Sequence, residues 1–170
     1  MKIRAATAHD LPAICDIHTR SWRIAYAGML PDDFLGAPLE AWMADAWADV
    51  PTGEVLLLVA ETSDIVGFAC VRCDHPDGPL LDNLHVAQAA QGQGVGLALM
   101  QEAVKHLADM GKTGMWLEVL SGNISARRFY ARLGGVEGSV FRDAVAGHPV
   151  PGHRVVWDGF EKILSAGQKS

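Results

Sequence analysis

The sequence has few features that would cross-link the chain, anchor it in a membrane or export it. Its 170 residues include only three cysteines. No apolar run approaches the ~20 residues that a membrane-spanning helix requires. The start of the chain, Met1-Lys2-Ile3-Arg4, lacks the apolar core of a signal peptide. We therefore expect a cytoplasmic protein with free thiols and without a membrane partner.

Basic side chains are also scarce. The chain has 14 lysines and arginines against 20 aspartates and glutamates, which gives a formal net charge of -6. This balance argues against nonspecific binding of nucleic acid, because that binding depends on neutralising phosphates. It favours a cationic ligand if the acidic side chains gather near a site.

A metal site is not expected either. Cys70-Val-Arg-Cys73 has the spacing of a CxxC motif, and Cys15 is the one other cysteine. In an extended strand, residues three apart point to opposite faces. No second cysteine pair or nearby histidine completes a site, so we interpret the cysteines as structural.

The composition is that of an ordinary globular protein. Apolar residues make up 49% of the chain and charged residues 20%, and the length suits one domain with a single core. We expect this domain to cover residues 1–164 and to be followed by a polar tail, 165–170.

The first half of the chain predicts two helical stretches among several strands. A strand over residues 3–6 precedes a helix that Asp10 can cap and that ends near residues 25–28. A second helical stretch begins at Pro31 and ends before Pro51. Residues 54–61, 65–72 and 80–86 then read as strands of an antiparallel meander.

The second half alternates helices and strands. A helix over residues 94–110 ends at Gly111 and leads to a strand over 115–120. Asn123 is a credible N-cap for a helix that continues to about Leu133. The strands 136–142 and 153–158 can pair as a final hairpin across residues 143–152.

The run Gln91-Gly92-Gln93-Gly94-Val95-Gly96 lies where this second-half helix begins. The first N–H groups of a helix lack partners within the helix, and its dipole adds positive charge there. Glycines let an anion approach closely, so a pyrophosphate is a natural ligand. The pattern alone is also compatible with a plain flexible loop.

Two other phosphate-binding motifs fit less well. A Walker loop needs Lys and Ser or Thr after its last glycine, where this chain has Leu97 and Ala98. A Rossmann fingerprint has the spacing GxGxxG rather than GxGxG, although Glu118 lies at a suitable distance for a ribose-binding acid. A dinucleotide-binding domain therefore stays open as a minor alternative.

The stretch from Leu80 to Gly135 resembles the acetyl-CoA-binding core of the GNAT superfamily of N-acetyltransferases. The glycine run matches the superfamily's loop signature, Gln/Arg-x-x-Gly-x-Gly/Ala, after a strand that ends in Leu-x-Val. A downstream signature is also present, from Asn123 through Phe129 and Tyr130 to Leu133-Gly134-Gly135. The order of elements matches over essentially the whole chain.

The chain departs from the superfamily's pattern at three points. It has Val86-Ala87-Gln88 where many members have Val-x-Pro, and no basic residue in the glycine run. It has Gly134-Gly135 where Gly-Phe is usual. We expect weaker cofactor affinity from the missing cation and looser packing after the last core helix.

The resemblance implies an α/β (α+β) domain with a central mixed, mostly antiparallel, splayed sheet of about seven strands and about four helices. It implies acetyl-CoA as acetyl donor and direct transfer to a primary amine of a small molecule or peptide in a ternary complex. A monomer or homodimer is expected. The alternatives are a noncatalytic acyl-CoA-binding sensor on the same fold and an acidic interaction module with an empty loop.

The resemblance also implies the cofactor site. Backbone groups at the end of the strand over 80–86 would hold the pantetheine arm and the thioester oxygen, the glycine run would hold the pyrophosphate, and residues of the later helix would flank the arm. The residues are Leu84, His85, Val86, Gln91, Gly92, Gln93, Gly94, Val95, Gly96, Leu97, Ala98, Asn123, Ser125, Ala126, Phe129 and Tyr130.

Three side chains are candidates for proton transfer. Tyr130 resembles the superfamily's tyrosine acid, which protonates the departing thiolate. Glu118, twelve residues earlier, resembles the general base of ribosomal-protein N-terminal acetyltransferases, and we expect desolvation to raise its pKa. Asp82 is the rival base, because we expect it on the strand face of Leu84 and Val86.

His85 is expected on the opposite strand face, where a histidine is more often a core residue than a catalyst. Trp22 and Tyr26 are implied to lie near the acceptor pocket, between the first two helical stretches. The sequence leaves the identity of the amine open.

Overall fold

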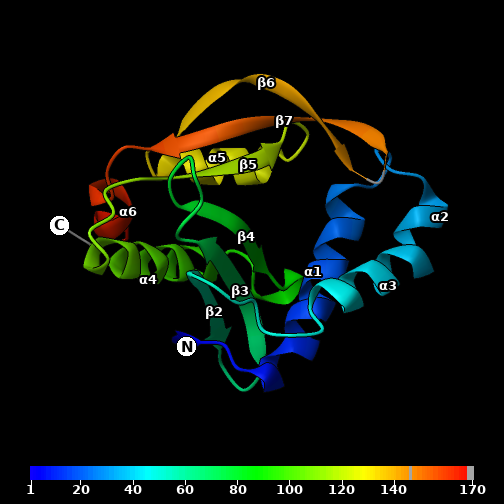
Figure 1. The fold of residues 1–170 in the computed structure, drawn as a ribbon, viewed down its shortest axis with the longest axis horizontal. Helices are drawn as coiled ribbons and strands as arrows, with labels where there is room; N and C mark the ends of the chain where they lie inside the picture. The colour runs from blue at the N-terminus through cyan, green and yellow to red at the C-terminus, as the bar shows by residue number, and fades with distance from the viewer. Residues whose placement is uncertain (146, 168–170) are drawn as a thin grey trace.

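The computed structural model describes residues 1–145 and 147–167 and is built around one seven-stranded sheet (Figure 1). The strands follow the order β1-β2-β3-β4-β5-β7-β6, and every neighbouring pair is antiparallel except β4 and β5. This confirms the predicted mixed, mostly antiparallel sheet. The strands are β1 Lys2–Ala5, β2 Val55–Glu61, β3 Ile65–Arg72, β4 Leu80–Val86, β5 Met115–Leu120, β6 Val136–Val145 and β7 His148–Trp157.

Six α-helices surround the sheet in the described part of the chain, two more than expected. They are α1 Leu11–Ala25, α2 Asp32–Leu35, α3 Ala37–Ala46, α4 Val95–Asp109, α5 Ile124–Arg132 and α6 Glu161–Ser165, with short 3₁₀ turns η1 at Ala8–Asp10 and η2 at Gln88–Ala90. None of the described helices is long and apolar enough to cross a membrane.

The helical stretch predicted after Pro31 is in fact two helices. Gly36 lies between them with non-helical dihedral angles, φ -85° and ψ -129°. Pro38 follows in the first turn of α3, where the missing N–H costs no helical hydrogen bond. A proline at this position starts a new helix instead of continuing the old one.

The sequence suggested that Asp10 caps α1 with its side chain, but no such hydrogen bond forms. Its carboxylate instead accepts hydrogen bonds from the Thr7 N–H and from the guanidinium of Arg4, which also binds Glu61. Asp10 therefore joins the first strand to the first helix, and the Arg4 guanidinium holds the pKa of the Asp10 carboxyl well below its usual value.

The final hairpin is longer than predicted, because β6 and β7 extend through most of the expected loop. β7 contains Pro149 and Pro151, although a proline has no N–H to donate within a sheet. They are tolerated because β7 runs past the end of β5, whose last paired residue, Leu120, lies opposite Gly152. The prolines thus lie in a part of β7 that has no β5 residue beside it. After β7, the residues that were predicted as the end of the domain form α6.

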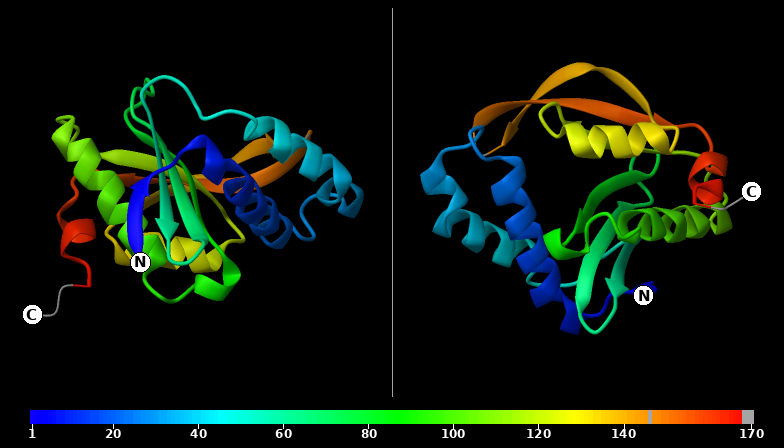
Figure 2. Two further views of the ribbon diagram at one scale, coloured as in Figure 1. Left: turned by 90° about the horizontal axis from the view of Figure 1, so that it is seen from below. Right: turned by 180° about the vertical axis from the view of Figure 1, so that it is seen from behind.

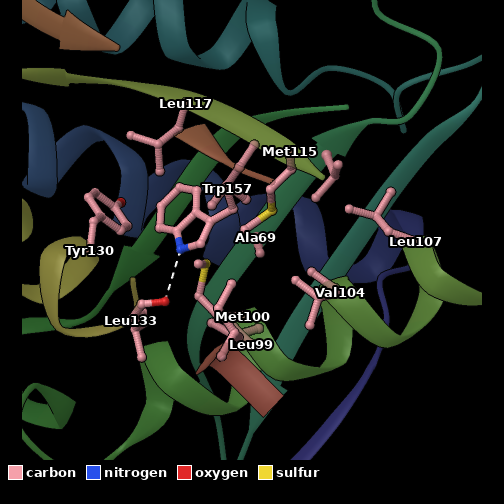
Figure 3. Close-up of a cluster of buried hydrophobic side chains, with 14 of the residues drawn as sticks. Ala69, Leu99, Met100, Val104, Leu107, Met115, Leu117, Tyr130, Leu133 and Trp157 are labelled. Carbon is pink, nitrogen blue, oxygen red and sulfur yellow. Dashed lines mark hydrogen bonds between the residues drawn. The ribbon is translucent and has the colours of Figure 1, made fainter. Parts of the chain in front are cut away.

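The helices cover both faces of the sheet (Figure 2). On one face, α4, α5 and α6 enclose the larger core, in which Trp157 lies between Tyr130 and Leu133 and donates its Nε1–H to the Leu133 carbonyl at 3.0 Å (Figure 3). Gly135 leaves room for this indole. The usual aromatic side chain after the last core helix is therefore replaced by Trp157 from β7.

On the other face, α1 and the end of α3 enclose a smaller core that contains the buried imidazole of His18. Trp47 Nε1 donates to His18 Nδ1 at 2.9 Å, and the ring of His85 lies 4.5 Å from that of His18 between centroids. The His18 Nε2 atom is buried without a partner in the described part of the chain. Burial lowers the pKa of His18 to about 4, against the opposing charge of Asp82, and lowers that of His85 to about 3.

The close fit around Trp157 predicts that Gly135→Ala destabilises the fold. An added Cβ would lie 2.5 Å from Val155 Cγ1 and 2.6 Å from Trp157 Cζ2, so we expect a loss of about 1–3 kcal/mol from overpacking. Urea unfolding followed by tryptophan fluorescence measures it. In the matched control Gly138→Ala, the new Cβ meets nothing closer than 3.5 Å. Equal stability of the two variants would contradict this packing.

The buried His18 and the half-buried His85 predict a fall in stability in mild acid. Their folded-state pKa values, about 4 and about 3, lie below the ordinary 6.5, so the unfolded state binds protons first as the pH falls. The free energy of unfolding should have its full value above pH ~6.5. Below that pH it should decrease, by about 1–2 kcal/mol per histidine at pH 5. Urea unfolding at pH 7.5 and 5.0 checks this. His85→Phe should reduce the difference, and the exposed control His9→Gln should keep it.

Candidate active site

The sheet opens between β4 and β5, its one parallel pair of strands. The two strands are paired only at Leu80 and Trp116, near their starts, where the Trp116 N–H donates to the Pro79 carbonyl at 3.0 Å. Beyond this pair β4 leads to η2 and α4, while β5 pairs on its other side with β7 along its whole length. The later residues of β4 and β5 therefore face a gap in the sheet, as the predicted splay requires.

The backbone of β4 directs polar groups into this gap. The Ala87 N–H donates to the Val66 carbonyl at 2.9 Å, which makes Gly67 and Val86 a non-hydrogen-bonded pair of the antiparallel ladder. By alternation, the N–H and C=O groups of Leu84 and Val86 point away from β3. Those of His85 point toward β3 and therefore do not face the gap.

The glycine run lies beside the same gap, at the start of α4. Gly92 and Gly94 have positive φ angles of 75° and 81°, and a Cβ at either would meet no atom within 4 Å. The exposed turn thus brings the first N–H groups of α4 to an open surface, where a phosphate group fits. The Gln91 amide donates to the Val86 carbonyl at 3.2 Å and ties this turn to the end of β4.

The Asn123 motif lies against the glycine run. The Asn123 side chain accepts from the Ala126 N–H at 3.1 Å, which confirms the predicted N-cap of α5. Phe129 of this helix approaches Gly96 of α4, where a Cβ would lie 3.5 Å from the ring. The two separate sequence motifs therefore meet at one end of the gap, and Ser125 is exposed there.

Tyr130 is buried on the α4 side of the sheet. Its ring packs edge-on against Phe129 and Trp157, at centroid distances of 5.4 and 5.8 Å. The hydroxyl makes no hydrogen bond to another described residue, and burial raises its pKa above the ordinary value. The phenol therefore stays protonated at neutral pH and has a proton to donate.

Glu118 lies on the opposite face of β5. Its neighbours Leu117 and Val119 belong to the core beneath α4, whereas Glu118 borders a small pocket of about 100 Å³ together with Tyr26. Glu118 is exposed, so the expectation of a desolvated carboxylate is not met in this structure. Tyr26 lines this pocket, and the ring of Trp22 packs against that of Tyr26 at 4.5 Å between centroids.

The sequence predicts Asp82 on the strand face of Leu84 and Val86, but in the structure Asp82 lies on the other face. The pairing skips Asp82, since Cys70 lies opposite Asn83 and Val71 lies opposite Leu81. This bulge turns Leu81 to the α4 side with Leu84 and Val86. Asp82 instead forms an ion pair with Arg72 at 2.9 Å, and its charge acts on His18 and Cys70 of the other face.

His85 lies on the α1 side, as predicted. Its ring packs between His18 and Phe68, with centroid distances of 4.5 and 5.3 Å. With its lowered pKa it is neutral at physiological pH, and it would be a weak proton acceptor for an ammonium group. Its position favours the core interpretation over a catalytic one.

The pocket residues of the final hairpin were not predicted from the sequence as site residues. Val145, Val150 and Gly152 lie in the extensions of β6 and β7 that were assigned to a loop, whereas Phe141 lies in the predicted strand 136–142. One local signal for the longer strands was Gly147, whose positive φ of 78° marks the turn between them. The pocket residues of these two strands are Phe141, Val145, Val150 and Gly152.

Comparison with known proteins agrees with this geometry. Residues 11–135 match the model of the acetyltransferase (GNAT) family. An uncharacterized N-acetyltransferase of Mycobacterium bovis is 35% identical over 129 residues, which cover 74% of this chain and 82% of that protein. An uncharacterized N-acetyltransferase of Bacillus subtilis is 27% identical over 128 residues, 72% of this chain and 73% of that protein.

The fold has solved counterparts as well. A Salmonella typhimurium structure with its cofactor acetyl-CoA superposes with a TM-score of 0.66 at 20% sequence identity, and the match covers 100% of this chain and 97% of that one. The matched family model spans the helix α1, the glycine run and the Asn123 motif. This chain therefore belongs to the GNAT acetyltransferase family and is an acyltransferase that uses acetyl-CoA as its acetyl donor.

Proposed function

We propose that this protein transfers the acetyl group of acetyl-CoA directly to a primary amine of a small molecule or peptide, in a ternary complex. The observation that carries the proposal is the gap between β4 and β5, which opens after the Leu80–Trp116 pair beside the glycine start of α4. On each side of this gap stands one side chain suited to proton transfer.

The gap and the glycine run suit the cofactor. The outward backbone groups of Leu84 and Val86 would hold the pantetheine arm, and the Val86 carbonyl keeps a lone pair beside its bond from Gln91. The N–H groups from Val95 to Leu97 would receive the pyrophosphate, since Gly92, Gly94 and Gly96 carry no Cβ that would block its approach. Bound acetyl-CoA supplies an activated acyl group on sulfur.

Tyr130 is the proposed general acid. Transfer of the acetyl group leaves a thiolate, which needs a proton. The Tyr130 hydroxyl is protonated at neutral pH, as a tyrosine ordinarily is, and no described residue competes for its hydrogen bond. Its position in α5, next to Phe129 and the start of α4, is at the end of the gap where the arm would lie.

Glu118 is the proposed general base. The attacking amine must lose a proton, and Glu118 carries a carboxylate into the pocket on the α1 side of β5. Entry of an acceptor would remove water from around this carboxylate and strengthen its attraction for the proton of the amine. Glu118 is favoured over Asp82, because Glu118 lines the pocket and Asp82 does not.

The placement of the two side chains favours direct transfer. Tyr130 lies on the α4 side of the sheet and Glu118 on the α1 side. Donor and acceptor can therefore meet across the gap, each with its own proton-transfer group, without an acetylated enzyme as an intermediate.

We expect Tyr130→Phe to lower kcat by about 10²-fold or more while leaving acetyl-CoA affinity unchanged, because only the acid is lost. Release of free thiol measures turnover and calorimetry measures binding. The melting temperature should stay close to that of the wild type, since the ring keeps its contacts. An unchanged kcat would remove Tyr130 from the acid role, and wild-type binding of acetyl-CoA without any turnover would favour the acyl-CoA sensor.

We expect Glu118→Gln to lower kcat/KM by about 10²-fold and to remove the acidic limb of its pH profile, because the base is lost. Asp82→Asn is the matched comparison, a carboxylate neutralised outside the pocket, and should lower kcat/KM less than about threefold. The reverse order of effects would transfer the base role to Asp82.

A further inference from the structure

The pocket next to Glu118 is lined mainly by apolar and aromatic groups. This lining indicates what kind of acceptor the pocket binds. We propose that the acceptor is a small primary amine whose amino group is attached directly to an apolar or aromatic body. This inference depends on the proposed acetyl transfer and names its substrate class. The described lining residues are Tyr26, Glu118, Val119, Leu120, Phe141, Val145, Val150 and Gly152.

The carboxylate of Glu118 favours a positively charged acceptor. This carboxylate borders the pocket, and the chain as a whole carries a net charge of -6. An ammonium group would be attracted to this end of the pocket and would lie within reach of the proposed base. Two aromatic rings, of Tyr26 and Phe141, add faces that attract cations. A primary amine enters this pocket in its charged form and gives its proton to Glu118.

The apolar side chains that line the pocket determine which kind of group can carry the amine. Among the described lining residues, only Glu118 and Tyr26 have polar side chains. Leu120, Val145 and Val150 offer no hydrogen bond from theirs, so a hydroxyl buried against these three stays unpaired. An alkyl or aryl group loses nothing there and gains from leaving water. The pocket should therefore discriminate against acceptors with hydroxyl groups next to the amine, such as amino alcohols and aminoglycosides.

The walls are held in place from behind. The Phe141 ring lies over Gly152, where a Cβ would be 3.2 Å from its Cζ and 3.2 Å from the Val119 carbonyl oxygen. Trp22 stacks on Tyr26 at 4.5 Å between centroids and in turn meets Trp42 edge-on at 4.9 Å. These contacts keep both aromatic side chains along the pocket, so its shape is largely formed before an acceptor binds.

The size of the pocket limits the acceptor further. Its volume of about 100 Å³ is smaller than the ~150 Å³ apolar cavity that holds benzene. It can take a short alkyl chain or part of an aromatic ring, and the rest of a longer acceptor lies at its mouth. A sugar ring with several hydroxyl groups does not suit it in volume or in polarity.

The test compares kcat/KM among amines of matched size. Propylamine, butylamine and phenethylamine form the apolar panel, and ethanolamine, putrescine, spermidine and an aminoglycoside form the polar one. We expect propylamine to exceed ethanolamine by about tenfold or more, since the two differ by one hydroxyl in place of a methyl group. Free-thiol release with saturating acetyl-CoA gives the rates for the wild type.

Two variants locate the preference in the pocket. Phe141→Ala removes an aromatic wall and should reduce the propylamine-to-ethanolamine ratio severalfold, with acetyl-CoA affinity unchanged by calorimetry. Val140→Ala is the matched control on β6, because Val140 is 58% exposed and does not line the pocket. It should keep the wild-type ratio. The wild-type panel decides the question even if Phe141→Ala fails to fold.

The outcomes separate the two proposals. Acetyl transfer with equal or higher kcat/KM for the polar panel would overturn the apolar-acceptor inference and leave the acetyltransferase function in place. Binding of acetyl-CoA without transfer to any amine of either panel would overturn the proposed function, and the inference with it. A preference for apolar amines that Phe141→Ala leaves unchanged would overturn the assignment to this pocket.

Discussion

The parting of β4 and β5 is the constraint on which the rest of the structure depends. A parallel pair of strands that stayed together would close the sheet and leave no backbone group free at its centre. Here the pairing stops after Leu80 and Trp116, and the polar groups of Leu84 and Val86 turn into the opening. Each of the strands is held on its other side by an antiparallel partner, which lets them diverge without unfolding.

Both faces of the sheet contribute chemistry to this opening. The larger core beneath α4 buries Tyr130, whose phenol stays protonated at neutral pH. The other face carries Glu118 in a pocket closed by the end of α1 and by the final hairpin. Alternation along β5 separates the two roles, since residues 117 and 119 go to the core and residue 118 to the pocket.

Departures from the family's usual residues have local replacements. Where Gly134-Gly135 lacks the common aromatic residue, Trp157 of β7 fills the space against Gly135 and bonds to the Leu133 carbonyl. Where the glycine run lacks a cation, backbone N–H groups at the start of α4 remain for an anion, and Gln91 ties the turn to Val86. The same fold is thus reached with different side chains.

The sequence by itself determined the local features: the strands of the meander, the glycine turn, the Asn123 cap and the order of elements that identifies the family. These depend on hydrophobic periodicity, turn chemistry and capping, which act over a few neighbouring residues. Only the tertiary structure decided the bulge at Asp82, the exposure of Glu118 and the pocket wall at Phe141. Strand register, burial and the pairing of distant strands set these features, and no local pattern encodes them.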